Sequence, residues 1–395
     1  MPDAKARVLV VAGYFDWFSG YQETVLARAL ARLADTSVLA GNLVSPIFSD
    51  DHLRRIGQDR TYEPGTTLEN GVSITRLPVR ELRSMVWSSQ VAKAVTAGDY
   101  DLVVQVMPGQ LLPAGASLGR ARRRVSLYGD NAAMYAGLSK RAARVKFTAF
   151  AATKGILYSL VNSRADAVYG YTPDTLERLR WFGVKRTMKL LPLAFDSTVY
   201  AFDSTTRRRT RDSLGLSSHD IAIIAAGKIQ PQKRLDALVD AVSNLRSEHP
   251  NLRLVLVGLD STDTSRALQD RIEGAGLSDA TIMKPFVGAS ELNALFNAAD
   301  IGAWPAMPAI TIQQAMATGL TTVIPDNSFT SHLLSAGTSA LALHGDSLSE
   351  SLTETLAVAI NTRTRTDHER TALADGSAWL CSDTIAAQLL EGAPS

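Results

Sequence analysis

The sequence predicts an α/β protein with two doubly wound domains, in which helices cover both faces of a parallel sheet. Continuous apolar runs that end at glycine are typical of buried parallel strands, and here they alternate with segments of helical spacing. This alternation occurs twice along the chain, and a polar, basic stretch separates the two series. The chain has 395 residues, more than the roughly 100–200 of an ordinary domain, so we expect two domains.

The first series begins with the apolar run Arg7 to Ala12, which Gly13 closes. Apolar residues then recur at helical spacing, which predicts a helix from Gln22 to Leu33. The remaining strands of this series are expected at Ser37–Ala40, Asp101–Val106, Arg124–Tyr128 and Ala165–Tyr169.

The second series begins with Ile221 to Gly227 and continues with a helix from Leu235 to Arg246. Further strands are expected at Leu252–Gly258, Thr281–Lys284, Asp300–Trp304 and Leu320–Pro325, and further helices at Ala289–Ala299, Leu348–Ile360 and Thr371–Leu390. Between the two series, the basic run Ser204 to Arg211 is interpreted as a solvated linker that leads into a helix. The predicted domains are therefore 1–195 and 196–365, with 366–395 as a C-terminal helix that crosses back to the first domain.

Composition excludes several classes of function. Hydrophobic residues make up 46% and charged residues 20% of the chain, as in a soluble globular protein. The 41 Lys and Arg nearly balance the 39 Asp and Glu, which argues against nucleic acid as a partner. The single cysteine, Cys381, rules out an internal disulfide framework, and the scattered histidines predict no metal site. Met1 to Arg7 leads directly into a strand without a signal-peptide pattern, so we expect a cytoplasmic location.

Two lysines follow the first strand of the second series. Gly227 allows a ligand to approach the backbone closely, and Lys228 and Lys233 flank the turn after it. Two ammonium groups at this spacing suit one diphosphate, whose charge they would neutralise as it leaves. A surface turn with two lysines is the alternative on spacing alone.

The segment Ala303 to Gly319 reads as a strand end, a Pro-rich loop, a short helix and a glycine stop. This layout places a helix N-terminus at the carboxyl edge of a parallel sheet, where open α/β sheets bind ligands. Backbone N–H groups of Ala309, Ile310 and Thr311, and the Thr311 hydroxyl, are candidates for contact with a bound ligand.

The second half resembles the retaining family-four glycosyltransferases of the GT-B fold. Lys228 and Lys233 stand at the Arg and Lys positions of the family's diphosphate motif, and Arg234 stands where the family usually has Gly. Phe286 and Val287 lie where family members hold the nucleotide base. The resemblance covers roughly residues 190 to 340. It implies two Rossmann-like domains facing across a cleft, no metal requirement, and a nucleotide diphosphate sugar as donor with no permanently bound cofactor.

Two glutamates of the family's donor-sugar motif are replaced in this chain. They correspond to Ala306, where the family usually contacts the sugar, and Gln314, where it usually binds the ribose. Gln314 can still donate and accept hydrogen bonds to a ribose. Thr311 and Gln314 also fit a capping box, with Thr311 at the N-cap, and Gln313 is the ribose partner if the register shifts by one.

The first half carries the candidates for the acceptor side. The loop after the first strand resembles the family's Gly-Gly loop, with Gly13 at its start and Ser19-Gly20 at the Gly-Gly place. Its aromatic residues (Tyr14, Phe15, Trp17 and Phe18) are either a stacking platform for an acceptor or packing of the loop onto the domain. Asp130, with Asn131 beside it, is the candidate to orient the acceptor hydroxyl, or else a plain turn residue.

The expected function is transfer of a sugar from a nucleotide diphosphate sugar to a hydroxyl with retention of configuration. The acceptor is a glycan, a glycolipid or a small molecule. The basic, partly apolar stretch Lys140 to Ser163 is either a solvated face or a surface for peripheral contact with an anionic inner membrane face. The alternatives are a degenerate GT-B subunit that binds a nucleotide sugar or a partner without turnover, and a GT-B sugar phosphorylase or epimerase.

Overall fold

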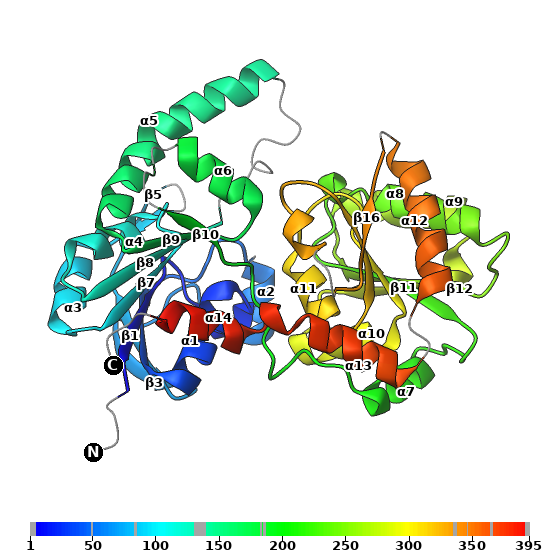
Figure 1. Ribbon diagram of the computed structural model, residues 1–395, viewed down its shortest axis with the longest axis horizontal. Coiled ribbons are helices and arrows are strands. Elements are labelled where there is room, and N and C mark those ends of the chain that lie inside the picture. Colours follow the sequence, from blue (N-terminus) through cyan, green and yellow to red (C-terminus); the bar gives the residue numbers. More distant parts are fainter. Residues whose placement is uncertain are drawn as a thin grey trace. The chain divides into compact units, whose positions relative to one another are not determined.

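The computed structural model describes residues 5–48, 50–82, 85–129, 140–181, 184, 187–334, 338–345, 347–363 and 366–391. Contacts divide the chain into two units, Met1–Ala194 with Ser382–Ser395, and Phe195–Cys381. The chain therefore passes between the units twice, and it returns to the first at Ser382 rather than at residue 366 (Figure 1).

The first unit contains an eight-stranded sheet in the order β10-β9-β8-β7-β1-β2-β4-β3, in which only β3 is antiparallel to its neighbour among the described strands. Its strands are β1 (Arg7–Val11), β2 (Asp35–Gly41), β3 (Gly65–Glu69), β4 (Val72–Leu77), β7 (Leu102–Val106), β8 (Arg123–Tyr128), β9 (Ala167–Gly170) and β10 (Met188–Leu190), with a separate hairpin of β5 (Arg80–Leu82) and β6 (Met85–Trp87). Its helices are α1 (Gln22–Leu33), α2 (Asp50–Ile56), α3 (Val91–Ala97), α4 (Leu111–Gly115), α5 (Lys140–Arg164), α6 (Pro173–Trp181) and α14 (Ser382–Leu390).

Alternation along β1 explains why helices cover both faces of this sheet. Val8 and Val10 pack with residues of α1 and α14, whereas Leu9 and Val11 pack with residues of α3 and α4. Since side chains of a strand point alternately to opposite faces, a continuous apolar run requires a cover on each face.

The second unit contains a six-stranded parallel sheet in the order β13-β12-β11-β14-β15-β16. Its strands are β11 (Ile221–Ala226), β12 (Leu252–Leu259), β13 (Thr281–Pro285), β14 (Ile301–Ala303), β15 (Thr321–Pro325) and β16 (Ala340–Leu343). Its helices are α7 (Ser204–Ser213), α8 (Leu235–Leu245), α9 (Asp263–Gly274), α10 (Ala289–Ala298), α11 (Ile310–Met316), α12 (Leu348–Thr362) and α13 (Asp367–Gly376). One face of β11 packs against α8, α9 and α12, and the other against α10 and α11.

The basic run before the second sheet is not a solvated linker. It forms α7, whose N-cap Asp203 accepts a hydrogen bond from the backbone N–H of Thr206 (2.6 Å). Two of its arginines, Arg207 and Arg211, form ion pairs with the buried Asp300 at 2.6 and 3.2 Å. Asp300 lies about 90 residues further along the sequence than these arginines. The composition of the run therefore could not reveal the ion pairs, and the prediction of a solvated linker was wrong.

The predicted C-terminal helix Thr371–Leu390 is two helices. α13 ends at Gly376, and α14 begins at Ser382 after a short 3₁₀ turn. Arg32 of α1 donates from Nε to Asp383 of α14 (2.8 Å), while Ile385, Ala386 and Leu389 pack into the core of the first unit.

Candidate functional site

The order of strands in the second sheet creates a topological switch point between β11 and β14. From β11 the chain continues to β12 on one side, whereas β14 pairs with β11 on the other, Ile223 being level with Ile301. Loops that leave the carboxyl ends of two such strands diverge, and ligands of open α/β sheets bind in the crevice between them. The lysine turn follows β11, and the Pro-rich loop follows β14.

Gly227 and Gly258 let the loops after β11 and β12 approach each other. Gly227 has a φ of 127° and Gly258 a φ of 109°, both in the region that favours glycine. A Cβ on Gly258 would lie 2.5 Å from the carbonyl oxygen of Gly227, and a Cβ on Gly227 would lie 2.6 Å from Nζ of Lys233. Any side chain at Gly227 would therefore displace the Lys233 ammonium.

The turn ends at Arg234, which adopts the left-handed conformation (φ 54°, ψ 41°) just before α8. This conformation explains why a glycine suits the same position in proteins with the related motif. The Arg234 guanidinium pairs with Asp236 at 3.0 Å, and Asp236 lies in the first turn of α8.

Lys233 is the unusual cation of this turn. Its burial, and next the nearby Lys228 ammonium, lower the pKa of Lys233 to about 8. Among the described residues, no carboxylate lies within ion-pair distance of either lysine. The nearby Asp260 accepts hydrogen bonds from Thr262 and Ser265 (2.5 and 2.7 Å), and these contacts, together with Lys228, lower its pKa. An anion bound here would relieve the repulsion between the two lysines.

A buried hydrogen-bond network joins the loop after β14 to the end of β11. The Thr311 hydroxyl donates to the carbonyl oxygen of Ala226 (2.8 Å) and accepts a hydrogen bond from Nε1 of Trp304 (3.0 Å). The indole N–H also reaches the Ala226 oxygen at 3.1 Å. This network fixes the side chains of Trp304 and Thr311 at the carboxyl end of β11.

The predicted capping box is wrong. α11 begins at Ile310, its N-cap is Ala309, and that cap has no side-chain hydrogen bond. Thr311 lies inside the first turn with its hydroxyl engaged by Ala226 and Trp304. Gln314 therefore does not serve as the third residue of a capping box.

The amides of Gln313 and Gln314 differ in their surroundings. With its nitrogen facing the helix start, Gln313 donates to the carbonyl oxygens of Ala309 (3.1 Å) and Ile310 (3.3 Å). Gln314 is only 7% exposed, and its buried Oε1 has no hydrogen-bond partner. An unpartnered buried amide oxygen costs about 1–3 kcal/mol, which a ligand hydroxyl could recover.

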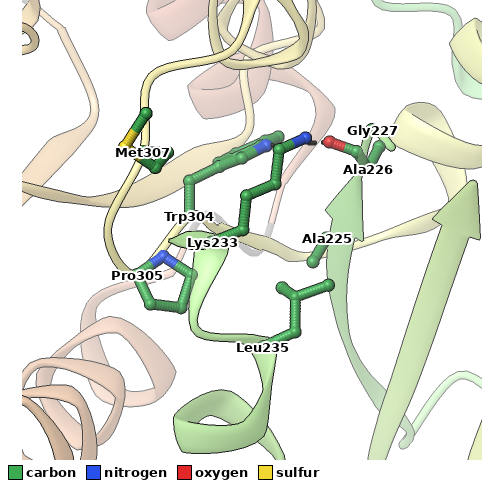
Figure 2. Close-up of a pocket in the computed structure, with 8 residues that line it drawn as sticks. All are labelled: Ala225, Ala226, Gly227, Lys233, Leu235, Trp304, Pro305 and Met307. Atoms are coloured by element: carbon green, nitrogen blue, oxygen red, sulfur yellow. Dashed lines mark hydrogen bonds between the residues drawn. The ribbon is translucent and has the colours of Figure 1, made fainter. Parts of the chain in front are cut away.

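A small hollow lies where the two loops meet. It is lined by Ala225, Ala226, Gly227, Lys233, Leu235, Trp304, Pro305 and Met307 (Figure 2). Lys233 is the charged residue of this lining, with Gly227 beside its ammonium, and the other lining residues are apolar. Phe286, at the end of the edge strand β13, is 70% exposed, and Val287 beside it is half-buried.

The loop after β1 in the first unit is mostly packing rather than platform. Tyr14 and Phe15 are buried, and the Tyr14 hydroxyl donates to Glu81 (2.7 Å). Trp17 is half-buried and packs edge-on against Phe15, with ring centroids 4.9 Å apart. Phe18 is 37% exposed and is the member of the set that faces solvent.

One residue near this loop, Gln110, was not found from the sequence. A Cβ on Gly13 would lie 1.6 Å from Oε1 of Gln110, an oxygen that is buried without a partner. Gln110 follows β7, which neighbours β1 at the switch point of this sheet. Gly20 has a φ of 63° and ends the short 3₁₀ turn after Asp16. The candidates Asp130 and Asn131 lie outside the described residues.

Comparison with solved structures identifies the fold. Sucrose-phosphate synthase from Thermosynechococcus elongatus matches with a TM-score of 0.70 over 98% of both chains, at 15% identity. HepE of Anabaena, solved with UDP and glucose, matches with a TM-score of 0.65 over 98% of both chains, at 18% identity. The chain has the GT-B fold, as expected from its sequence.

The family match lies in the second unit. Residues 206–372 match the family described as glycosyl transferases group 1. Mannosylfructose-phosphate synthase of Agrobacterium fabrum is 26% identical over 46% of this chain and 42% of its own length. A D-inositol 3-phosphate glycosyltransferase of Paenarthrobacter aurescens is 30% identical over 36% of each chain. The similarity thus spans less than half the length of these relatives.

Proposed function

We propose that this protein is a glycosyltransferase that moves a sugar from a nucleoside diphosphate sugar to an acceptor hydroxyl, with retention of configuration and without a metal. The observation that carries the proposal is the Lys233 ammonium. It is held beside Gly227 at the switch point of a group 1 domain, and burial and Lys228 lower its pKa to about 8. A diphosphate supplies the negative charge that this position lacks.

Lys228 and Lys233 hold the diphosphate and stabilise it as the leaving group. A cation placed where charge develops lowers the barrier because it strengthens its contacts as the bond to the sugar breaks. Gly227 lets the phosphate approach the backbone, and Gln314 offers its unpartnered oxygen to a ribose hydroxyl. Phe286 and Val287 contact the base, and the segment Ala309 to Thr311 forms the wall beside the sugar.

The acceptor binds to the first unit in this proposal. Gly13 and Gly20 allow close approach at the loop after β1, and Asp130 with Asn131 orients the acceptor hydroxyl. The hydroxyl attacks the sugar carbon, the bond to the diphosphate breaks, and the leaving phosphate oxygen takes the acceptor proton.

A lipid-linked acceptor and peripheral contact with an anionic membrane fit helix α5. Its Val145 and Ile156 are 64% and 72% exposed, and Arg141 is exposed near its start. Apolar and cationic side chains on one helix favour a membrane surface. In the described part of the chain, no helix is long and apolar enough to span a membrane. A related protein of Mycolicibacterium smegmatis is named a phosphatidylinositol monomannoside mannosyltransferase.

The test is a thermal-shift panel of UDP-, GDP-, ADP-, CDP- and dTDP-sugars with the full chain. A ligand at about 100 times its Kd stabilises the folded protein by about 2.7 kcal/mol, which such a panel detects. Lys233→Met should remove the shift, whereas Lys189→Met, an exposed lysine of the first unit, should retain it. No shift with any nucleotide sugar would overturn the proposal.

A second assay separates turnover from binding alone. Transfer to an acceptor panel supports the transferase. A shift without transfer would instead favour a subunit that only binds, an alternative that the alanine at position 306 supports because a sugar-binding glutamate is expected there. Release of a sugar phosphate that depends on inorganic phosphate would favour a phosphorylase.

A further inference from the structure

The side chains of the loop that follows β14 offer no hydrogen-bonding group to a ligand. From Pro305 to Ile310 every side chain is apolar. Pro305 and Pro308 also lack a backbone N–H, so the backbone donors of this segment are those of Ala306, Met307, Ala309 and Ile310. This composition is unusual beside a proposed sugar site, because sugar hydroxyls that lose water need polar partners.

The polar side chains that flank this loop, those of Trp304 and Thr311, are engaged within the protein. The Thr311 hydroxyl and the Trp304 indole N–H both serve the carbonyl oxygen of Ala226. The carbonyl oxygen of Ala309 accepts from the backbone N–H of Ile312 (3.1 Å) and from the Gln313 amide (3.1 Å). The Gln313 amide also occupies the carbonyl oxygen of Ile310. A ligand hydroxyl that used these groups would therefore have to replace a hydrogen bond within the protein.

The hollow has two chemically different ends. Lys233 and Gly227 form the end that suits phosphate, and Pro305, Met307 and Leu235 contribute apolar surface (Figure 2). Ala306 lies between Pro305 and Met307, is half-buried, and has a methyl group as its whole side chain. A group attached to a diphosphate held by Lys233 thus meets apolar surface on the side of this loop.

We infer that the donor is a deoxy sugar nucleotide, with Ala306 and its loop as the determinant of specificity. The inference rests on the proposed function and names its donor class. A methyl or methylene group of a deoxy sugar packs against Pro305, Ala306 and Met307. A hydroxyl at the same place loses its water and finds no side-chain partner on this loop. An apolar pocket rejects an added hydroxyl by up to about 100-fold, so the preference is for the deoxy sugar without excluding the parent sugar.

The experiment has two stages. The first tests the proposed function and the second tests the preference for a deoxy sugar, so that each can fail separately. Calorimetry with UDP, GDP, ADP, CDP and dTDP first identifies the nucleotide, and no binding of any would refute the proposed function. The Kd of that nucleotide's glucose derivative is then compared with those of its 3-, 4- and 6-deoxy analogues. We expect at least one analogue to bind about 10- to 100-fold more tightly than the parent. If the parent binds as tightly as every analogue, or more tightly, the inference is wrong.

Two variants of Ala306 test whether this loop determines the preference for a deoxy sugar. Ala306→Glu adds a hydroxyl acceptor and should shift the preference at least tenfold toward the parent sugar. Ala306→Met adds similar volume without an acceptor and should keep the preference for the deoxy analogue. Both variants should bind the free nucleoside diphosphate as the unchanged protein does, which shows that they are folded. Equal behaviour of the two variants toward parent and analogue would overturn the role of Ala306.

Discussion

The hydroxyl of Thr311 donates a hydrogen bond to the carbonyl oxygen of Ala226, at 2.8 Å, and so joins the first turn of α11 to the last residue of β11. These residues are 85 positions apart in the sequence. The contact sets the distance between the lysine turn and the apolar loop, because the turn begins after Ala226 and the loop ends before Thr311.

Thr311→Val should therefore loosen the switch point. The variant keeps the shape of the side chain but removes two hydrogen bonds, leaving Trp304 to serve Ala226 alone. We expect a loss of about 1–3 kcal/mol in stability and weaker nucleotide binding, measured by thermal unfolding and calorimetry. Thr318→Val, which removes a hydroxyl bonded within its own helix end to Ala315 (2.8 Å), should lower stability without weakening nucleotide binding. Equal nucleotide affinity in both variants would contradict a role for the Thr311 contact.

Donor affinity should fall as pH rises through about 8. Burial and Lys228 lower the pKa of Lys233 to about 8, and a bound diphosphate raises it again. Below pH 8 the free protein already carries the charged ammonium, so affinity is then insensitive to this group. Above pH 8 binding takes up a proton, and affinity falls by up to about tenfold per pH unit. Calorimetry from about pH 7 to about pH 9 in two buffers measures both effects, and Lys233→Met should abolish the proton uptake.

The role of Gln314 can be tested with two nucleotides that differ only in the ribose. If its unpartnered oxygen serves the ribose, the protein binds UDP more tightly than its 2′-deoxy counterpart, by about 1–3 kcal/mol. If another nucleoside diphosphate is the ligand, that pair is used. Gln314→Leu should remove the difference. Gln313→Leu should destabilise α11 but should keep the difference in affinity between the two nucleotides. The reason is that the Gln313 amide is bonded to the first turn of its own helix. A difference that survives Gln314→Leu would assign the ribose to another residue.

Gly227→Ala should impair the site through the backbone and through Lys233. The residue has a φ of 127°, and the added Cβ would lie 2.6 Å from Nζ of Lys233. We expect a stability cost of about 1–3 kcal/mol from the strained conformation and loss of measurable diphosphate binding. Gly274→Ala is the matched control, because Gly274 ends α9 and a Cβ there meets nothing within 4 Å. That variant should be as stable as the unchanged protein and should bind normally.

Membrane contact through α5 can be measured by flotation with vesicles of about 30% anionic lipid at low salt. The unchanged protein should float with these vesicles, and a Val145→Ser, Ile156→Ser double variant should stay in solution. Leu118→Ser, at another site where the apolar side chain is 60% exposed, should float normally. Protein that does not float at low salt would end the membrane proposal.

Periodicity predicted the strands that are buried on both faces and some of the helices that cover them, but not α3, α4 or α9. The helix Gln22–Leu33 has the predicted bounds, and β11 and β12 lie within one residue of theirs. Strands β3, β4, β5, β6, β10 and β16 were not predicted. β3 and β10 are edge strands with no or little buried surface, so they lack a continuous apolar run.

The sequence by itself determined the two βα series, the lysine turn and the apolar loop, because each is a local pattern of apolar spacing, charge or glycine. Only the tertiary structure decided what the polar side chains do. Thr311 bonds to Ala226 instead of capping α11, Arg207 and Arg211 pair with Asp300, and Lys233 is half-buried near Lys228. These roles depend on partners from distant segments, which strand order and register bring together and which local spacing does not encode.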